Sequence, residues 1–320
     1  MIGLRILVCL ALAATGCNRD VPHDPAVALM PLTQSDAADD AAPAESRAAA
    51  YRSRIAASSR YRASQQAQRA AFDGLGKSDW IAPLSEVVPA LEARAGAGEA
   101  EAAFVLGDRL SRCHKAFDTR TPAVVIGEYE AELVALGLDP DRDADNIRLR
   151  NLDSHTMHEL DHYAECEAVR PAVTRAAGWL EQAAQAGHAA ARISFATGGL
   201  AEYTSRGALI RNAEEAARRQ ALARQWLEAG IRDGNERALD RYVTAVRNGD
   251  LLYPRDAHAA QVYGYAQQLL RARRVGDFDA LWRDGPWRAP GVDDAAWQAV
   301  VSEGRQLFDS NFRDAPLYPQ

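Results

Sequence analysis

The segment LEQAAQAGHAAA, residues 180–191, decides the fold, because its spacing recurs elsewhere in the chain. LEARAGAGEAEA (91–102) and LEAGIRDGNERA (227–238) align with it without a gap, and LLRARRVGDFDA (269–280) is a weaker fourth copy. Each copy begins with Leu and has Gly seven residues later and Ala eleven residues later. In chain order these residues are Leu91, Gly98 and Ala102; Leu180, Gly187 and Ala191; Leu227, Gly234 and Ala238; and Leu269, Gly276 and Ala280.

This spacing predicts a helical hairpin. The Leu is buried on the first helix, and the Gly supplies the left-handed residue just past the end of that helix. The Ala, early in the second helix, lets two backbones approach closely. One hairpin cannot bury its apolar face alone, so we expect the copies to stack. From Trp80 onward there is no convincing alternating run of β-branched residues, which favours an all-α fold.

The pattern resembles the Sel-one-like repeat family, whose members are related to tetratricopeptide repeats. Besides the Leu, Gly and Ala positions, Trp179 and Trp226 stand just before the Leu of their copies. The resemblance covers residues 80–285 and implies a right-handed superhelical solenoid of about four hairpins, with a concave surface that holds proteins or peptides. The third copy departs from the pattern, because Asp240 and Arg241 stand where its second helix should be most apolar.

An insertion interrupts the repeats. The interval between Leu91 and Leu180 is longer by about one hairpin than the later intervals, and the excess lies between Cys113 and Cys166. We predict an inserted helical hairpin over residues 114–165, including a helix at TPAVVIGEYEAELVALG (121–137). In an oxidising compartment an even pair of cysteines forms a disulfide by default, so Cys113 and Cys166 are expected to join the base of the insertion.

The amino-terminal end reads as a secretory signal. Residues 1–16 carry Arg5 and then an apolar run that is too short to be a permanent membrane span. The stretch Ala14-Thr15-Gly16-Cys17 resembles the lipobox of bacterial lipoproteins, which implies lipidation of Cys17. The alternative is an ordinary cleaved signal that leaves Cys17 as a spare thiol. We expect a lipid-anchored protein in the cell envelope of a Gram-negative bacterium, at the outer membrane and facing the periplasm.

The composition of the remaining segments defines the other boundaries. Residues 17–45 are rich in Pro, Asp and Ala and predict a flexible, lipidated tether. Residues 46–78 predict a basic helix and linker, which either touches anionic lipid headgroups or cell-wall polymer or is a solvated helix face. The solenoid is expected over 79–290, and a capping helix and tail over 291–320, where VDDAAWQAVVSEGRQLFDSNF (292–312) is amphipathic.

The sequence HELDH, residues 158–162, matches the pattern H-E-x-x-H of zinc hydrolases. That pattern would make His158 and His162 zinc ligands and Glu159 the general base. A catalytic zinc needs a third protein ligand, and Glu181 stands at a suitable distance along the chain. However, Glu181 occupies the second position of its repeat, where Glu92 and Glu228 stand in other copies. The repeat therefore explains Glu181 without a metal.

We accordingly predict that HELDH is a chance match, that the protein is not an enzyme and that it needs no cofactor. The main alternative is a structural or adventitious metal site built from His158 and His162 with His155 or His114. The simpler interpretation is a helix that packs through apolar residues and carries its histidines at a partly buried rim. Those apolar residues are Leu152, Leu160 and Tyr163.

The function expected from the resemblance is protein binding, as a scaffold or adaptor. Tyrosines that would line the binding surface are Tyr203, Tyr242, Tyr263 and Tyr265, with core packing as the competing role. One alternative is an envelope inhibitor or immunity-type lipoprotein that binds one toxin or hydrolase through the insertion. The other is the zinc hydrolase. The net charge of −7 argues against nucleic acid as a partner, because binding to phosphates needs clustered positive charge.

Overall fold

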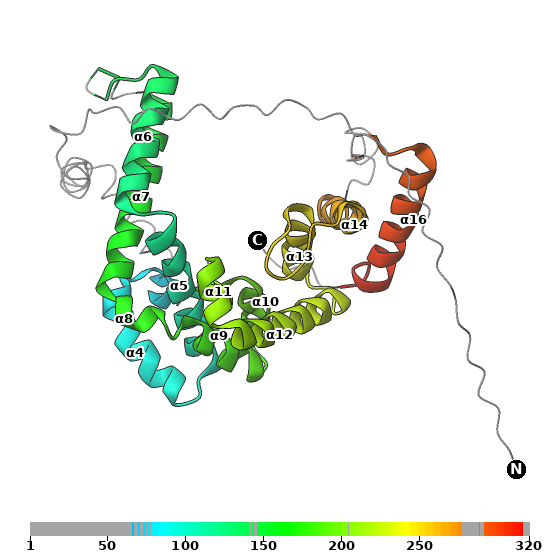
Figure 1. Cartoon of the computed structure of the whole chain (residues 1–320), viewed down its shortest axis with the longest axis horizontal. Helices are drawn as coiled ribbons and strands as arrows, with labels where there is room; N and C mark the ends of the chain where they lie inside the picture. Colours follow the sequence, from blue (N-terminus) through cyan, green and yellow to red (C-terminus); the bar gives the residue numbers. More distant parts are fainter. Residues whose placement is uncertain are drawn as a thin grey trace, which may run out of the picture. The chain divides into compact units, whose positions relative to one another are not determined.

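The structure is a computed structural model that describes residues 78–140, 142–143, 146–203, 205–276, 288 and 291–315, with positions 66, 70, 73, 74 and 76. The expected signal peptide, Cys17, the tether and most of the basic segment lie outside the described residues. The fold is all-α, as predicted: in the described ranges all regular structure is helical (Figure 1). No helix in these ranges is both long and apolar enough to cross a bilayer.

Thirteen helices are described. They are α3 (Ser78–Ile81), α4 (Leu84–Gly96), α5 (Ala100–Asp118), α6 (Pro122–Leu136), α7 (Ile147–Ala168), α8 (Arg170–Val173), α9 (Ala176–Gln185), α10 (Ala189–Gly198), α11 (Arg206–Arg211), α12 (Ala213–Arg232), α13 (Glu236–Asn248), α14 (Ala257–Val275) and α16 (Asp294–Asn311).

The first three copies of the spacing are helical hairpins, α4–α5, α9–α10 and α12–α13. In each hairpin the Leu and the Ala are fully buried. The Gly between them has a positive φ, of 93° at Gly98, 94° at Gly187 and 74° at Gly234. In the fourth copy Leu269 is buried on α14 and Gly276 has φ 69°, whereas Ala280 lies outside the described residues.

The turns of these three hairpins share the same backbone hydrogen bond. The residue after each glycine donates its backbone N–H to the carbonyl oxygen five residues earlier, which satisfies an otherwise unpaired carbonyl at the helix end. These bonds join Glu99 to Arg94 at 3.1 Å, His188 to Ala183 at 3.0 Å and Asn235 to Gly230 at 2.8 Å. A left-handed glycine makes this geometry possible, which explains its place in the repeat.

Successive hairpins pack against one another through one hydrophobic core. Helix α5 contacts α4 and α9, α10 contacts α9 and α12, and α13 contacts α12 and α14. The buried apolar residues form a continuous cluster from Leu84 on α4 to Phe312 just after α16. The helix expected over 292–312 is α16, which packs on α14 and buries Trp297, Val300 and Phe308.

The insertion forms a hairpin of α6 and α7, which run side by side (Figure 1). A separate small core holds the two helices together, and it consists of Val125, Ile126, Tyr129, Met157 and Leu160. The boundaries differ from those predicted, because α5 continues to Asp118 and α7 to Ala168. The predicted disulfide is confirmed: Cys113 on α5 and Cys166 on α7 are bonded, with both side chains fully buried.

Close approach of helices α5 and α9 depends on Gly107. A Cβ atom added at Gly107 would lie 2.7 Å from the backbone nitrogen of Leu180 and 3.0 Å from the carbonyl oxygen of Ala176. We expect Gly107→Ala to lower the free energy of unfolding by about 2 kcal/mol, because backbone cannot move aside cheaply. Urea denaturation followed by circular dichroism measures this loss.

Gly127→Ala on α6 is the matched control, since a Cβ at Gly127 meets nothing within 4 Å. Alanine has the higher helix propensity, so this substitution is expected to raise the free energy of unfolding by about 0.5–1 kcal/mol. An equal gain from Gly107→Ala would contradict the close approach of α5 and α9.

Candidate functional site

Glu159 of the HELDH segment lies on α7 and is held by an arginine. Nε of Arg120, in the turn between α5 and α6, donates to the Glu159 carboxylate at 3.1 Å, and Arg120 also pairs with Glu128. Burial raises the pKa of the Glu159 carboxyl, but the hydrogen bond and charge of Arg120 outweigh burial and lower the pKa below its ordinary value. A general base works best with a pKa near the working pH, so this environment is unsuited to that role.

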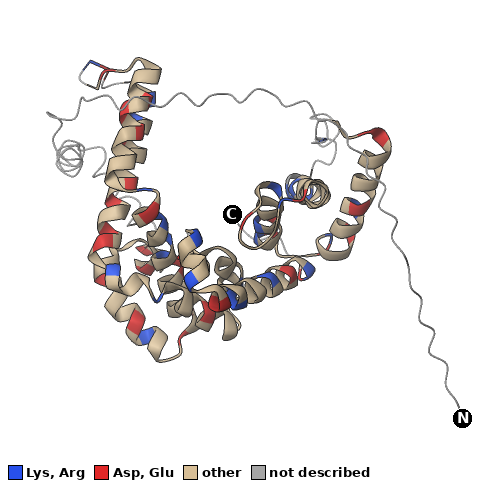
Figure 2. Ribbon diagram, viewed as in Figure 1, with Lys and Arg blue, Asp and Glu red and all other residues tan. Residues whose placement is uncertain are grey.

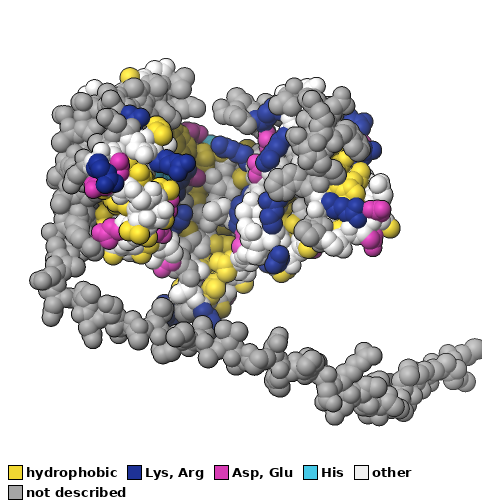
Figure 3. Space-filling view, turned by 90° about the horizontal axis from the view of Figure 1, so that it is seen from above, with side chains coloured by type: hydrophobic (Ala, Val, Ile, Leu, Met, Phe, Trp, Pro, Cys, Tyr) yellow, Lys and Arg dark blue, Asp and Glu magenta, His cyan; other side chains and the backbone are white. Residues whose placement is uncertain are grey.

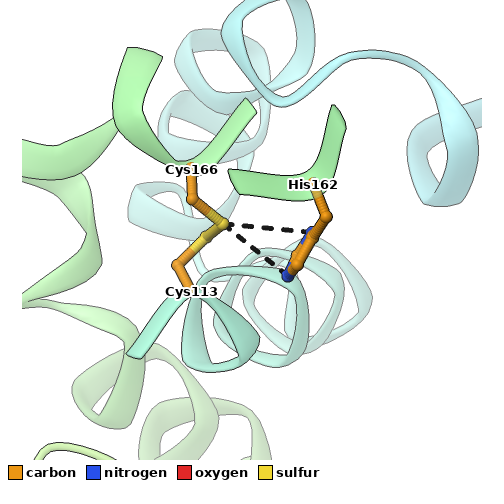
Figure 4. A group of neighbouring side chains, drawn as sticks. All are labelled: Cys113, His162 and Cys166. Atoms are coloured by element: carbon orange, nitrogen blue, oxygen red, sulfur yellow. Dashed lines mark hydrogen bonds between the residues drawn. A yellow bond between two sulfur atoms is a disulfide. The ribbon is translucent and has the colours of Figure 1, made fainter. Parts of the chain in front are cut away.

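His162 lies beside the disulfide (Figure 4). Its ring nitrogens are 3.7 and 4.0 Å from Sγ of Cys166, and Cys113, His162 and Cys166 are the one group of three potential metal ligands found among the described residues. Metals bind the thiolate form of cysteine, which a disulfide does not offer.

Among the described residues, neither the other histidines nor Glu181 completes a ligand set with His158. His158 and His155 are exposed on α7, whereas His114 is half-buried on α5. Glu181 on α9 instead pairs with Arg218 at 2.7 Å. HELDH therefore places its histidines and its glutamate in three different environments.

The half-buried histidines predict a stability that depends on pH. Burial lowers the pKa of His162, with the nearby His158 adding to the effect, and burial also lowers the pKa of His114. Below the ordinary value of 6.5 the unfolded chain therefore binds more protons than the folded chain. We expect the urea concentration at the unfolding midpoint to decrease when the pH is lowered from about 7.5 to about 5.5. The decrease should be smaller in His162→Gln. A midpoint that rises on acidification would contradict this direction.

The four tyrosines proposed as binding residues do not form one exposed set. Tyr203 is buried in the main core, and Tyr265 is buried where its ring meets Trp297 edge-on at a centroid distance of 6.1 Å. Tyr242 and Tyr263 are half-buried and pack together, with ring centroids 4.4 Å apart. Core packing thus buries much of the surface of these four rings.

A groove of about 870 Å³ lies along α5, α10 and α13, with α3 at one end. We call it the hairpin groove. Its volume is in the range of known ligand sites, about 300–1,000 Å³. Its apolar lining includes Trp80, Phe104 and Ile193, and its exposed charged lining includes Glu101 and Arg237.

The hairpin groove follows the repeat. Phe104, Ile193 and Asp240 each stand six residues after the glycine of their hairpin, and all three line the groove. Asp108 and Thr197, ten residues after their glycines, also line it. The second helices of three successive hairpins therefore present the same face to one surface, while the residues at those positions differ in chemistry.

Hydrogen bonds and ion pairs hold the charged walls of the groove at both ends. Glu101 accepts a hydrogen bond from Nε2 of His188 at 2.7 Å, and Asp108 pairs with Arg112 on α5. At the other end, Arg241 pairs with Asp250 at 2.6 Å and donates to the Ala196 carbonyl oxygen at 2.9 Å. Three acidic and three basic residues line the groove, so its charges balance and it favours no single sign of ligand; they are Glu101, Asp108, Asp240, Arg112, Arg237 and Arg241.

Sequence reasoning missed this groove, although one signal for it was present. Asp240 and Arg241 break the apolar pattern of the third copy, and both of them line the groove. A polar departure at a fixed repeat position indicates a side chain that faces the shared surface instead of the core. A comparison of the chain with protein families, with curated proteins and with solved structures finds no match.

Proposed function

We propose that this chain is a membrane-anchored periplasmic repeat protein that acts as a protein-binding scaffold or adaptor. The observation that carries the proposal is the hairpin groove, to which three successive hairpins contribute the same face of their second helix. Stacked hairpins of this kind build extended surfaces that hold a peptide or a partner protein. A groove with an apolar floor and charges of both signs suits such a segment.

The repeat interpretation extends the proposal to the architecture. Three hairpins share the buried Leu, the left-handed Gly and the buried Ala, and each hairpin packs on the next. These features support a Sel-one-like solenoid with α16 as its cap. All three hairpins also share the same backbone hydrogen bond at the turn.

The proposed location follows from two features. The lipobox-like stretch ending at Cys17 suggests a lipid anchor. The buried disulfide between Cys113 and Cys166 suits an oxidising compartment such as the periplasm. We therefore propose that the folded part lies on the periplasmic side of the outer membrane.

The α6–α7 hairpin supports a second candidate function, an envelope inhibitor or immunity-type lipoprotein. Among the described residues, most of the exposed large apolar side chains are on this hairpin, with Val134 83% and Ile147 59% exposed. The disulfide fixes the base of the hairpin, so these side chains could be presented to one toxin or hydrolase without a large ordering cost.

Site-specific photocrosslinking in the producing cells tests both candidates on the full chain. A photoreactive phenylalanine replaces Glu101 or Arg237 at the two ends of the hairpin groove, Val134 on the hairpin, or the exposed Glu86 on α4 as control. A scaffold should give the same protein adduct from Glu101 and Arg237 and none from Glu86. An adduct from Val134 alone would favour the inhibitor, and equal adducts at all positions would contradict both.

A further inference from the structure

A second hollow, of about 690 Å³, lies between α13, α14 and α16. We call it the arginine hollow, because Arg247, Arg255 and Arg271 stand at its exposed rim. Its floor is apolar and includes Val243, Tyr265 and Trp297, all of them buried. Asp240 lines both the hairpin groove and this hollow, so the two surfaces are continuous along α13.

The rim arginines have no acidic partner in the described part of the chain. The described ion pairs engage other arginines on these helices, such as Arg241 with Asp250 and Arg274 with Glu236, but none of them includes Arg247, Arg255 or Arg271. The one acidic residue of the lining, Asp240, accepts a hydrogen bond from Gln267. The ribbons of α13 and α14 are coloured blue at several positions in Figure 2, and the space-filling view shows dark blue side chains gathered near its centre (Figure 3).

Three arginines without an acidic partner in the described part of the chain line this one hollow, in a chain whose net charge is −7. Like charges that stand together without acids repel one another, and this repulsion weakens the folded state. A bound anion would remove the repulsion and accept charge-assisted hydrogen bonds from the guanidinium groups. The rim is therefore matched to a negatively charged ligand.

Gly264, in the middle of α14, leaves the hollow open. Gly within a helix costs roughly 1 kcal/mol relative to Ala. Other buried helix glycines have a packing reason: a Cβ at Gly304 would lie 2.8 Å from the carbonyl oxygen of Val262. At Gly264 a Cβ would meet only Nη2 of Arg247, at an ordinary 3.8 Å. Packing does not require this glycine, and a side chain there would project into the hollow, which Gly264 lines.

The apolar floor indicates what kind of anion fits. Val243, Tyr265 and Trp297 suit the carbon atoms of a peptide that carries Asp or Glu carboxylates better than a bare phosphate chain, which has no apolar part.

From these features we infer that the arginine hollow binds an acidic segment of the partner protein, with its carboxylates at Arg247, Arg255 and Arg271. The inference rests on the proposed function, because the segment would continue from the hairpin groove across Asp240. The partner protein would carry a stretch rich in Asp or Glu, and this stretch would lie in the arginine hollow.

Fluorescence anisotropy of the full-length protein with fluorescein-labelled hexaglutamate tests the inference, with labelled hexaglutamine as the neutral probe. We expect hexaglutamate to bind and hexaglutamine not to bind. Arg247→Gln with Arg271→Gln should weaken binding at least tenfold. The matched control is Arg148→Gln with Arg150→Gln on α7, which removes the same charge from exposed arginines outside the hollow and should change binding less than twofold.

Filling the hollow gives a second, independent variant. Gly264→Met should abolish binding, while Gly264→Ala should keep the helix and most of the affinity; thermal melting verifies that both variants fold. Equal weakening by the Arg148/Arg150 control, binding of polyphosphate but not of hexaglutamate, or unchanged binding in Gly264→Met would each overturn the inference. If Glu101 and Arg237 still give crosslinks but hexaglutamate does not bind, this inference alone is wrong. If neither the crosslinks nor hexaglutamate binding is observed, the proposed function is wrong as well.

Discussion

Replacing Cys113 and Cys166 together by alanine is expected to lower the free energy of unfolding by about 4 kcal/mol. The disulfide closes a loop with a sequence separation of 53, and the chain-entropy estimate for a loop of that length gives this magnitude. Both cysteines lie in the main core, whereas Met157 and Leu160, earlier on α7, belong to the small core of the inserted hairpin. Without it, the hairpin is held chiefly by contacts of α7 with α5 and α4.

Urea denaturation with and without dithiothreitol measures the effect. Reduction should destabilise the wild-type chain by about as much as the double substitution does, and it should leave the Cys113→Ala/Cys166→Ala variant unchanged. Since both sulfur atoms are fully buried, reduction of the folded chain is expected to be slow and to follow unfolding. A loss below about 1 kcal/mol would mean that packing alone holds the hairpin in place.

The sequence predicted the helical hairpins well because their signal is local. Three residues within a dozen positions determine each hairpin. In the middle copy Leu180 fills the core, Gly187 turns the chain and Ala191 permits close packing. The disulfide was predictable as well, since only one pair of cysteines remains once Cys9 is assigned to the signal peptide and Cys17 to the lipid anchor. In both cases the prediction depends only on neighbouring residues or on the number of cysteines.

The binding surfaces were not predictable in the same way. The arginine hollow combines α13, α14 and α16, and nothing near Arg247 in the sequence says that Arg271 lies across the same hollow. Gly264 reads as a weak point in a helix until its open surroundings are known. The tyrosines are predicted from residue type alone, and Tyr203 is buried in the main core.

Leu180→Ala should lower the free energy of unfolding by about 4 kcal/mol, near the upper end for a buried leucine. Leu180 is fully buried in the middle copy of the repeat and lies between two hairpins that approach closely. Cβ atoms added at Gly107 on α5 and at Gly198 on α10 would both clash with it. Because α5 and α9 are already in backbone contact there, they cannot move together to close the cavity that alanine leaves.

Val134→Ala is the matched control for Leu180→Ala, since it also removes aliphatic carbon from a helix but at a position that is 83% exposed. Its effect is expected to stay within about 0.5 kcal/mol. Leu91→Ala and Leu227→Ala, at the equivalent buried positions of the neighbouring copies, should each cost about 2–5 kcal/mol if the three hairpins form one stack. If Leu180→Ala lowers the free energy of unfolding as little as Val134→Ala does, the hairpins do not share a core. The hairpin groove, which depends on their stacking, would then be contradicted as well.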